Sequence, residues 1–332
     1  MNLTTHYLGI RLPHPIIVGS GPLTDDIDTV KELVDNGAAA LVLRSLYEEE
    51  ITGEQMTAFF HSESHGESSA EATSYAPDPE SAFGPDEYLE HVRRVKDAAR
   101  IPVMASLNCT THGGWTSYAR LIEEAGADAL ELHVFHAASD PSMSGAEVER
   151  QMIDIVRQVK QELRIPVAVK LSPLFTAFAH FARQLDAAGA DGLVLFNRFH
   201  RVDIDVLELE VLRRMELSTS SDLELRLRAT AMLSGRVKAS LAITGGVHTA
   251  LDVVKATMAG AHVTQMVSAL LRNGPRHLRK VRVDLEAWMD ENEWSSLDDL
   301  RGNMGFGRIP DPAAYERANS RMMSRYVEMR PE

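Results

Sequence analysis

The sequence predicts a (β/α)8 barrel, the TIM-barrel architecture, and two observations carry this prediction. Short apolar stretches typical of buried strands begin near residues 16, 39, 102, 128, 166, 191, 240 and 262. Between most of them lie stretches with apolar residues at spacings of three and four, which is the helical period. Eight strands alternating with helices in a chain of 332 residues favour a closed parallel barrel. An open doubly wound sheet is the alternative.

Most strand openings carry a local signal of their own. Four follow a glycine, at Gly37, Gly126, Gly189 and Gly260. Glycine accepts the left-handed conformation that ends many helices, so each of these phrases indicates a helix end and then a strand. Two further strands open with proline, in RIPVMASLN and RIPVAVKLS, where the missing N–H does least harm. The first and seventh strands lie in HPIIVGSGP and SLAITGGVH.

Two segments exceed this repeat. Residues 47–90 separate the second strand from the next helix and are rich in Ser, Glu, Ala and Pro. A loop of this length at the rim of a barrel is typical of a lid, with disorder as the alternative. We therefore predict one barrel domain over residues 1–302, with a lid insertion at 47–90. Residues 303–332 form a predicted C-terminal helical extension with apolar residues on one face.

Composition narrows the function classes. The 48 acidic and 34 basic residues give a formal charge of −14, which argues against nucleic acid or an anionic membrane as partner. A single cysteine, Cys109, excludes an internal disulfide and a multi-cysteine metal site. The amino terminus has neither the basic nor the apolar region of a secretory signal, and no apolar run reaches membrane-spanning length. We expect a soluble, cytoplasmic enzyme.

The ends of strands 7 and 8 suggest a phosphate site. Active sites of such barrels lie at the carboxyl ends of the strands, and phosphate commonly binds after strands 7 and 8. Strand 7 ends in Gly245 and Gly246, whose bare backbone can approach an anion. Strand 8 runs into Ser268, which we expect to cap a short helix. Turn geometry alone is the alternative reason for the two glycines.

The first strand also ends in a glycine-rich turn. It contains Gly19, Ser20 and Gly21, where a flat ligand could lie against bare backbone. Ordinary turn chemistry is the alternative. A ligand here would face the same end of the barrel as the predicted phosphate site.

Charged and polar side chains close three other strands. Arg44 closes strand 2, Lys170 closes strand 5 and Asn197 closes strand 6. Alternation predicts that Arg44 and Lys170 point into the barrel mouth, beside Glu131 and His133 of strand 4. Buried charges are costly unless they are paired or used, and a Lys170–Glu131 ion pair is compatible with either. A lysine beside an electron-accepting ring would stabilise the negative charge that develops there.

Strand 4 and the loop after it, in ELHVFHAASDP, bring two histidines to this end. A metal site needs a third ligand, and His133 and His136 begin on opposite faces of the strand, so no metal is predicted. His133 either donates to a ligand or packs. His136 is either a general base suited to neutral pH or a solvated loop histidine.

Several phrases occur together in one known family. HPIIVGSGPLT, IPVAVKLSP with Lys170, ITGGV before GAHVTQMVSALLRNGP, and SLDDLRG stand in the order found in the dihydroorotate dehydrogenases. The chain resembles class 1 members of that family of flavin barrels, and LFNRFHRVDID and DPAAYERAN are similar to its dihydroorotate dehydrogenase-like branch. The resemblance implies FMN as cofactor, with phosphate held at strands 7 and 8. The implied FMN-binding residues are Gly19, Ser20, Gly21, Ser45, His133, Lys170, Asn197, Gly245, Gly246 and Ser268.

Departures from the family concern the substrate. Arg44 stands where the family carries a lysine, which keeps the charge but not the compact ammonium. The lid reads APDPESA where the family has its Asn-x-Met-Gly-Leu substrate segment. His133 replaces an asparagine, and His136 falls near the family's catalytic cysteine or serine. The resemblance thus implies catalytic roles for His136, Lys170 and Arg44.

Three function classes follow. The first is an FMN-dependent oxidoreductase acting on a CH–CH bond of a small anionic substrate, as in the conversion of dihydroorotate to orotate in pyrimidine biosynthesis. The second is a flavin barrel that exchanges electrons with a protein partner and lacks dihydroorotate activity. The third is a flavin-free binding subunit. We expect the first class, in a homodimer, with an electron-acceptor protein as a possible further partner.

Overall fold

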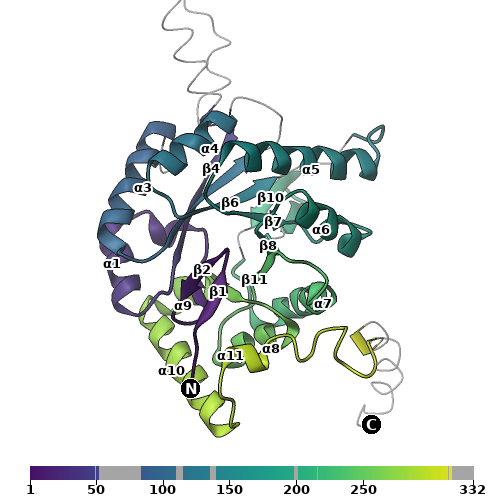
Figure 1. The fold of residues 1–332 in the computed structure, drawn as a ribbon. Helices are drawn as coiled ribbons and strands as arrows, with labels where there is room; N and C mark the ends of the chain where they lie inside the picture. The colour runs from purple at the N-terminus through teal and green to yellow at the C-terminus, as the bar shows by residue number, and fades with distance from the viewer. Residues whose placement is uncertain are drawn as a thin grey trace, which may run out of the picture.

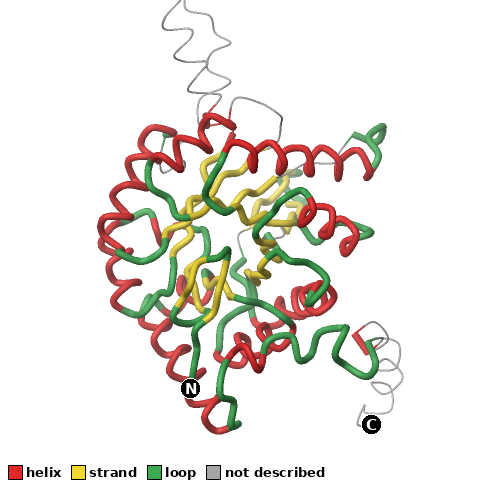
Figure 2. The backbone as a smooth tube through the Cα atoms, in the orientation of Figure 1, coloured by secondary structure: helices red, strands yellow, loops and turns green. Residues whose placement is uncertain are grey.

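Eight parallel strands form a closed barrel in the computed structural model, in the order β11-β12-β3-β4-β5-β6-β7-β8. The structure describes residues 1–48, 50–51, 84–109, 115–134, 140–197, 201–214, 216–312 and 314–315. The helices form an outer ring around the strands (Figures 1 and 2). The predicted barrel is confirmed, and closure of the sheet excludes the open doubly wound alternative.

Each barrel strand begins at its predicted position or one to two residues later. The strands are β3 (Ile16–Val18), β4 (Leu41–Tyr47), β5 (Val103–Cys109), β6 (Ala129–Val134), β7 (Val167–Leu171), β8 (Gly192–Leu195), β11 (Ser240–Thr244) and β12 (Val263–Met266). Their side chains are almost all buried, as expected where helices cover the outside of a parallel sheet.

The ring of helices follows the predicted pattern. Its members are α1 (Ile27–Asp35), α3 (Pro85–Ala99), α4 (Trp115–Glu124), α5 (Gly145–Glu162), α6 (Phe178–Ala187), α7 (Leu223–Leu233) and α8 (Ala250–Ala259), and α9 (Ser268–Asn273), α10 (Arg276–Glu291) and α11 (Leu297–Leu300) follow the last strand. The glycines expected before four strands all have positive φ, from 87° at Gly37 to 122° at Gly260. The local signals that ended helices therefore acted as predicted.

A short amino-terminal hairpin, which the sequence pattern did not reveal, closes one end of the barrel. Its strands are β1 (Thr5–Tyr7) and β2 (Ile10–Leu12). Tyr7, Leu8 and Leu12 are buried against the inward side chains at the amino ends of the barrel strands. Leu8 also donates its backbone N–H to Ser240 Oγ at 3.2 Å. Three-residue strands are too short to show a period, which explains why the pattern missed them.

A second hairpin, also unpredicted, follows β8 at the carboxyl end. Its strands β9 (Arg201–Asp205) and β10 (Glu210–Arg214) pair antiparallel, and Ile204 lies opposite Val211. Five apolar side chains of this hairpin are 64% to 87% exposed. They are Ile204, Val206, Leu207, Leu209 and Val211. This is a concentrated apolar surface on an otherwise acidic chain.

The predicted insertion and extension are only partly described. Helix α3 begins at Pro85, with Gly84 as its N-cap, so the predicted insertion 47–90 includes the first residues of a barrel helix. After the barrel, Met304 donates its N–H to Met258 O at 2.9 Å, and Tyr315 stacks on Phe306. The remaining extension lies outside the described residues. None of the helices in the described ranges is long and apolar enough to cross a membrane.

Candidate active site

Inward-facing side chains change chemistry along the barrel strands. At the amino ends they are apolar and pack with the β1–β2 hairpin. Two residues further along the same strands they become polar, because alternate residues of a strand face the same side. The apolar layer includes Met104, Ala129, Ala168 and Val263, and the polar layer includes Ser106, Glu131, Lys170 and Gln265. The polar layer faces the end where barrel enzymes place their sites.

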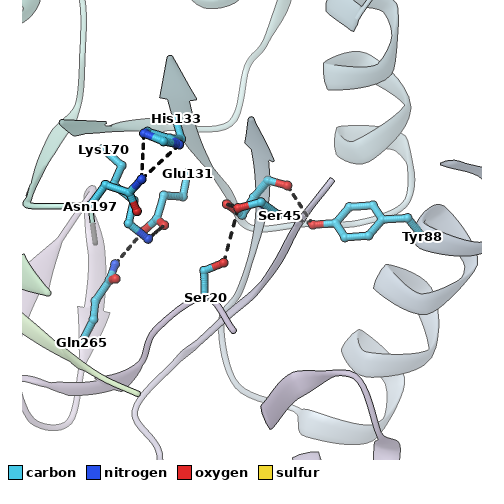
Figure 3. A network of polar contacts seen from close by, with 9 residues as sticks. Ser20, Ser45, Tyr88, Glu131, His133, Lys170, Asn197 and Gln265 are labelled. Carbon is cyan, nitrogen blue, oxygen red and sulfur yellow. Dashed lines mark hydrogen bonds and ion pairs between the residues drawn. The ribbon is translucent and has the colours of Figure 1, made fainter. Parts of the chain in front are cut away.

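Lys170 and Glu131 form a buried ion pair in this layer. Lys170 Nζ donates to Glu131 Oε1 at 2.9 Å, and the two side chains are 10% and 1% exposed. Gln265 Nε2 donates to the other carboxylate oxygen at 2.6 Å (Figure 3). The ion pair considered from the sequence is confirmed. Because two desolvated charges seldom repay their burial through stability alone, the pair is a candidate for function.

Gln265 completes this group and was not predicted. Its Oε1 is buried and has no hydrogen-bond partner among the described residues. A glutamine in the middle of the buried stretch HVTQM was a usable signal, since its parity places it inside the barrel. An unsatisfied buried acceptor at the mouth indicates a position where a bound group or water would donate.

His133 lies next to Lys170 across the β6–β7 pairing. Asn197 Nδ2 is 3.0 Å from His133 Nε2. The histidine of β6 and the asparagine that follows β8 therefore form one polar pair (Figure 3). An amide nitrogen only donates, so in this arrangement Nε2 accepts and a neutral imidazole carries its proton on Nδ1. The structure therefore brings together Lys170, His133 and Asn197.

Hydroxyl groups cover the other side of the mouth. Ser45 Oγ lies 2.7 Å from Ser106 Oγ and 3.4 Å from Ser20 Oγ. Tyr88 of α3 both accepts from Ser106 N at 2.9 Å and donates to Ser106 O at 3.1 Å (Figure 3). Burial raises the pKa of the Tyr88 hydroxyl well above its usual value. The sequence predicted Ser20 and Ser45 but missed Ser106 and Tyr88.

Arg44 departs from the expected alternation. The β4–β5 pairing shifts register between Val42 and Ser45, so Ser45 lies opposite Ser106. Arg44 pairs instead with Asp25, which accepts from Nε at 2.9 and 3.1 Å and also from Nη2. The expectation that Arg44 joins Lys170 inside the mouth is thus wrong for this structure. A bulge resets which residues face inward, and no residue pattern announced it.

Gly19 and Gly21 are explained by packing. A side chain at Gly19 would bring its Cβ to 2.9 Å from Val267 Cγ2, and one at Gly21 would come to 3.1 Å from Val267 Cγ1. The first strand and the residue after β12 therefore touch through glycine. Packing is therefore a sufficient reason for both glycines, and their ligand role stays a proposal.

The turn after β11 holds the predicted phosphate residues. Gly245 and Gly246 both have φ of 82°, a conformation that glycine adopts readily. Gly246 donates its N–H to Ser218 Oγ at 3.2 Å, and Ser218 donates its N–H to Ser268 Oγ at 3.1 Å. Ser218 thus links the two predicted phosphate elements. The sequence missed it because it lies in another segment, before α7.

Ser268 does not act as expected in one respect. It is the first residue of α9, Val267 is the N-cap, and no side chain caps the helix. Its hydroxyl accepts from the Ser218 backbone instead. The expected capping role is wrong, because Ser268 is the first helical residue and Val267 takes the N-cap position.

His136 falls within residues 135–139 and lies outside the described residues. Among the described residues, no three His, Cys, Asp or Glu side chains gather as metal ligands would. A cavity of about 660 Å³ lies at the opposite end of the barrel, between Ser234–Ala239 and Asp298–Arg308. It starts from the amino ends of β11 and β12, so it is separate from the Lys170 site.

Comparison of the sequence with known proteins shows to which family the chain is similar. A family model described as dihydroorotate dehydrogenase matches residues 2–289. The catalytic subunit of dihydroorotate dehydrogenase B (NAD(+)) of Thermoplasma acidophilum is 28% identical over 309 residues, covering 91% of this chain and 98% of that protein. The protein of the same name from Methanothermobacter thermautotrophicus is 24% identical, with 90% and 97% covered.

The chain is also similar to a protein that is named for a different activity. The chloroplastic dihydropyrimidine dehydrogenase (NADP(+)) of Arabidopsis thaliana is 21% identical over 320 residues, covering 89% of this chain and 75% of that protein. Together with a match that spans nearly the whole barrel, these comparisons establish that the chain belongs to the dihydroorotate dehydrogenase family.

Proposed function

We propose that this protein is an FMN-dependent oxidoreductase that acts on a CH–CH bond of a small anionic substrate, with dihydroorotate as the first candidate. The observation that carries the proposal is the buried Lys170–Glu131 pair beside His133 and Asn197. The names of the relatives from Thermoplasma acidophilum and Methanothermobacter thermautotrophicus support the choice of dihydroorotate. The dihydropyrimidine dehydrogenase relative supports a cyclic pyrimidine as the wider substrate class.

The described residues fit an FMN group on two observations. The first is the turn at Gly245 and Gly246, whose positive φ and neighbouring hydroxyls of Ser218 and Ser268 suit a phosphate. The second is the buried, unpartnered Gln265 Oε1 at the mouth, which suits a donor on a bound ring. The residues that would hold the flavin ring are Lys170, Ser20, Ser45, His133 and Asn197.

The proposed chemistry divides between the cofactor and the chain. When bound, FMN supplies an acceptor for the hydride that leaves one carbon of the CH–CH bond. His136 takes the proton from the other carbon as general base. Lys170 stabilises negative charge beside the ring, and Glu131 holds the ammonium in place. Arg44, which pairs with Asp25 outside the Lys170 group, takes no part in this step.

A protein partner is part of the proposal. Two relatives are named as catalytic subunits, which supports an electron-acceptor protein for this chain as well. The exposed apolar side chains of the β9–β10 hairpin support a protein contact at the carboxyl end. A second copy of the chain, in a homodimer, is the other proposed partner.

The test is anaerobic reduction of the purified protein after FMN is supplied. Bleaching of the flavin absorbance by dihydroorotate supports the proposal, and His136→Ala should slow that bleaching by on the order of 100-fold while FMN stays bound. A flavin spectrum that dihydroorotate does not bleach would sink the dihydroorotate assignment. A protein that takes up no FMN would sink the flavin proposal itself.

A further inference from the structure

Arg226 lies against the turn that follows β11. It stands on the first turn of α7, with Nε donating to Thr244 O and Nη1 donating to Asp222 O. A Cβ placed on Gly245 would lie 2.7 Å from Arg226 Nη2. The guanidinium therefore occupies the space beside Gly245, where the φ of 82° itself favours glycine.

The charge of Arg226 is not neutralised by an ion pair. No carboxylate of the described residues lies within salt-bridge distance of it; burial lowers its pKa, and the negative charge of Asp222 offsets part of that effect. The carboxylate of Asp222 accepts from Thr219 N at 2.8 Å. A guanidinium stays protonated in proteins, so the fold keeps a largely buried positive charge whose bonds are to neutral carbonyls. Such a charge is unfavourable unless an anion offsets it.

The same place collects hydrogen-bond donors. Leu223 N, at the start of α7, lies 2.4 Å from the position of a Cβ on Gly246 and donates to Ser220 O and Ser221 O. Gly246 N donates to Ser218 Oγ, and Ser218 N donates to Ser268 Oγ. The N-terminus of α8 follows at once, capped by Thr249. The cation thus stands beside a turn that is lined by the hydroxyls of Ser218 and Ser268 and followed by the N-terminus of α8.

We propose that Arg226 is the residue that gives this turn its preference for a dianionic phosphate group. It acts as a positioning residue: it binds the carbonyl of Thr244, orients the turn, and places a desolvated positive charge behind it. Since the peptide is planar, holding the Thr244 carbonyl also sets the direction of the Gly245 N–H. The inference rests on the proposed FMN site. It adds to that site a residue of α7, the helix that precedes β11.

The experiment compares two flavins that differ only by the phosphate. Binding of FMN and of riboflavin to flavin-free protein is titrated by fluorescence quenching for the wild type, Arg226→Gln and Arg228→Gln. Arg228 is an exposed arginine on the same helix, so its variant makes the same charge change without the burial. We expect Arg226→Gln to weaken FMN binding by about tenfold or more and riboflavin binding by less than about threefold, with Arg228→Gln close to wild type.

A purely structural role predicts another pattern. If Arg226→Gln weakens both flavins equally, Arg226 only supports the fold and the inference is wrong. Arg226→Lys retains the charge and serves if the glutamine variant does not fold; it should keep most of the FMN preference, and a preference lost in Arg226→Lys would contradict a role for the charge. Inorganic phosphate should raise the melting temperature of the flavin-free wild type and of Arg228→Gln but not of Arg226→Gln.

The outcomes separate the two proposals. A wild type that binds neither flavin overturns the proposed function together with this inference. A wild type that binds FMN and is bleached by dihydroorotate, while Arg226→Gln leaves the ratio of FMN to riboflavin affinity unchanged, overturns the inference alone.

Discussion

The two inner layers of the barrel are built from the same strands and differ in almost every physical property. Ala129, Ala168 and Val263 form part of an apolar floor that is sealed by the β1–β2 hairpin. Two residues later, Glu131, Lys170 and Gln265 form a buried polar layer with one acceptor left unsatisfied. The floor stabilises the barrel by burying apolar surface, whereas the polar layer carries desolvated charges that favour folding little. The difference separates the part that holds the fold from the part that does chemistry.

The largest effect should come from breaking the ion pair of the polar layer. Lys170→Met leaves Glu131 buried and unpaired, which should lower the free energy of unfolding by about 3–5 kcal/mol. The double variant Lys170→Met with Glu131→Leu removes the unpaired charge and should recover part of that loss, because Gln265 Nε2 then lacks its acceptor. Urea denaturation measures both, and reduction of bound flavin by substrate should stay impaired in the double variant. A double variant that reduces flavin at the wild-type rate would remove Lys170 from the site.

The floor provides the converse test. Leu8 is buried, and its Cδ2 lies 2.5 Å from the position of a Cβ on Gly192. Leu8→Ala should lower the free energy of unfolding by about 2–5 kcal/mol through the cavity it leaves. Because the floor lies away from the mouth, the affinity of the folded variant for FMN should change little. A large loss of flavin affinity would show that the two layers are coupled.

Two buried histidines at the amino ends of the barrel strands should make the stability of the fold sensitive to acid. Burial lowers the pKa of His14 and of His262 to about 4, and each accepts a backbone N–H on Nδ1, from Ile16 at 3.3 Å and from Leu241 at 3.0 Å. Above their unfolded pKa of about 6.5 both are neutral in either state and the stability is complete. As the pH falls from 6.5 towards 4, the unfolded chain takes up protons that the folded chain refuses, so stability decreases.

We expect each of these histidines to contribute a loss of about 3 kcal/mol by pH 4. Thermal unfolding of the wild type and of His262→Asn across this range measures it, and the variant should show a shallower decrease. His180→Asn, at an exposed position on α6, controls for removal of an imidazole. Equal slopes in wild type and His262→Asn would contradict the assigned burial effect.

The smallest effect concerns the border between α3 and the polar layer. Tyr88→Phe removes a hydroxyl that both accepts from and donates to the Ser106 backbone. Leaving those buried groups unpaired should lower the free energy of unfolding by about 1–3 kcal/mol, towards the lower end if water enters. Chemical denaturation provides the measurement, with flavin reduction as a second readout. A stability equal to wild type would indicate that Ser106 finds other partners.

The sequence by itself determined the barrel, the positions of its eight strands and most of the residues that meet at the mouth. These depend on local features: glycine at helix ends, apolar runs with helical or strand period, and the direction of a parallel strand, which sends every carboxyl end to one rim. Lys170, His133 and Asn197 were predictable for that reason. Each is a polar residue at the end of an apolar strand.

Only the tertiary structure decided the neighbours that depend on register and distant segments. The shift between Val42 and Ser45 turned Arg44 to Asp25, and no periodic pattern encodes such a bulge. Arg226 and Ser218 reach the Gly245 turn from chain segments before it, so their role depends on how α7 packs on the barrel. The period of side chains can be read from one segment of the chain. An ion pair, or a side chain that binds a distant turn, needs two segments, and only packing brings those segments together.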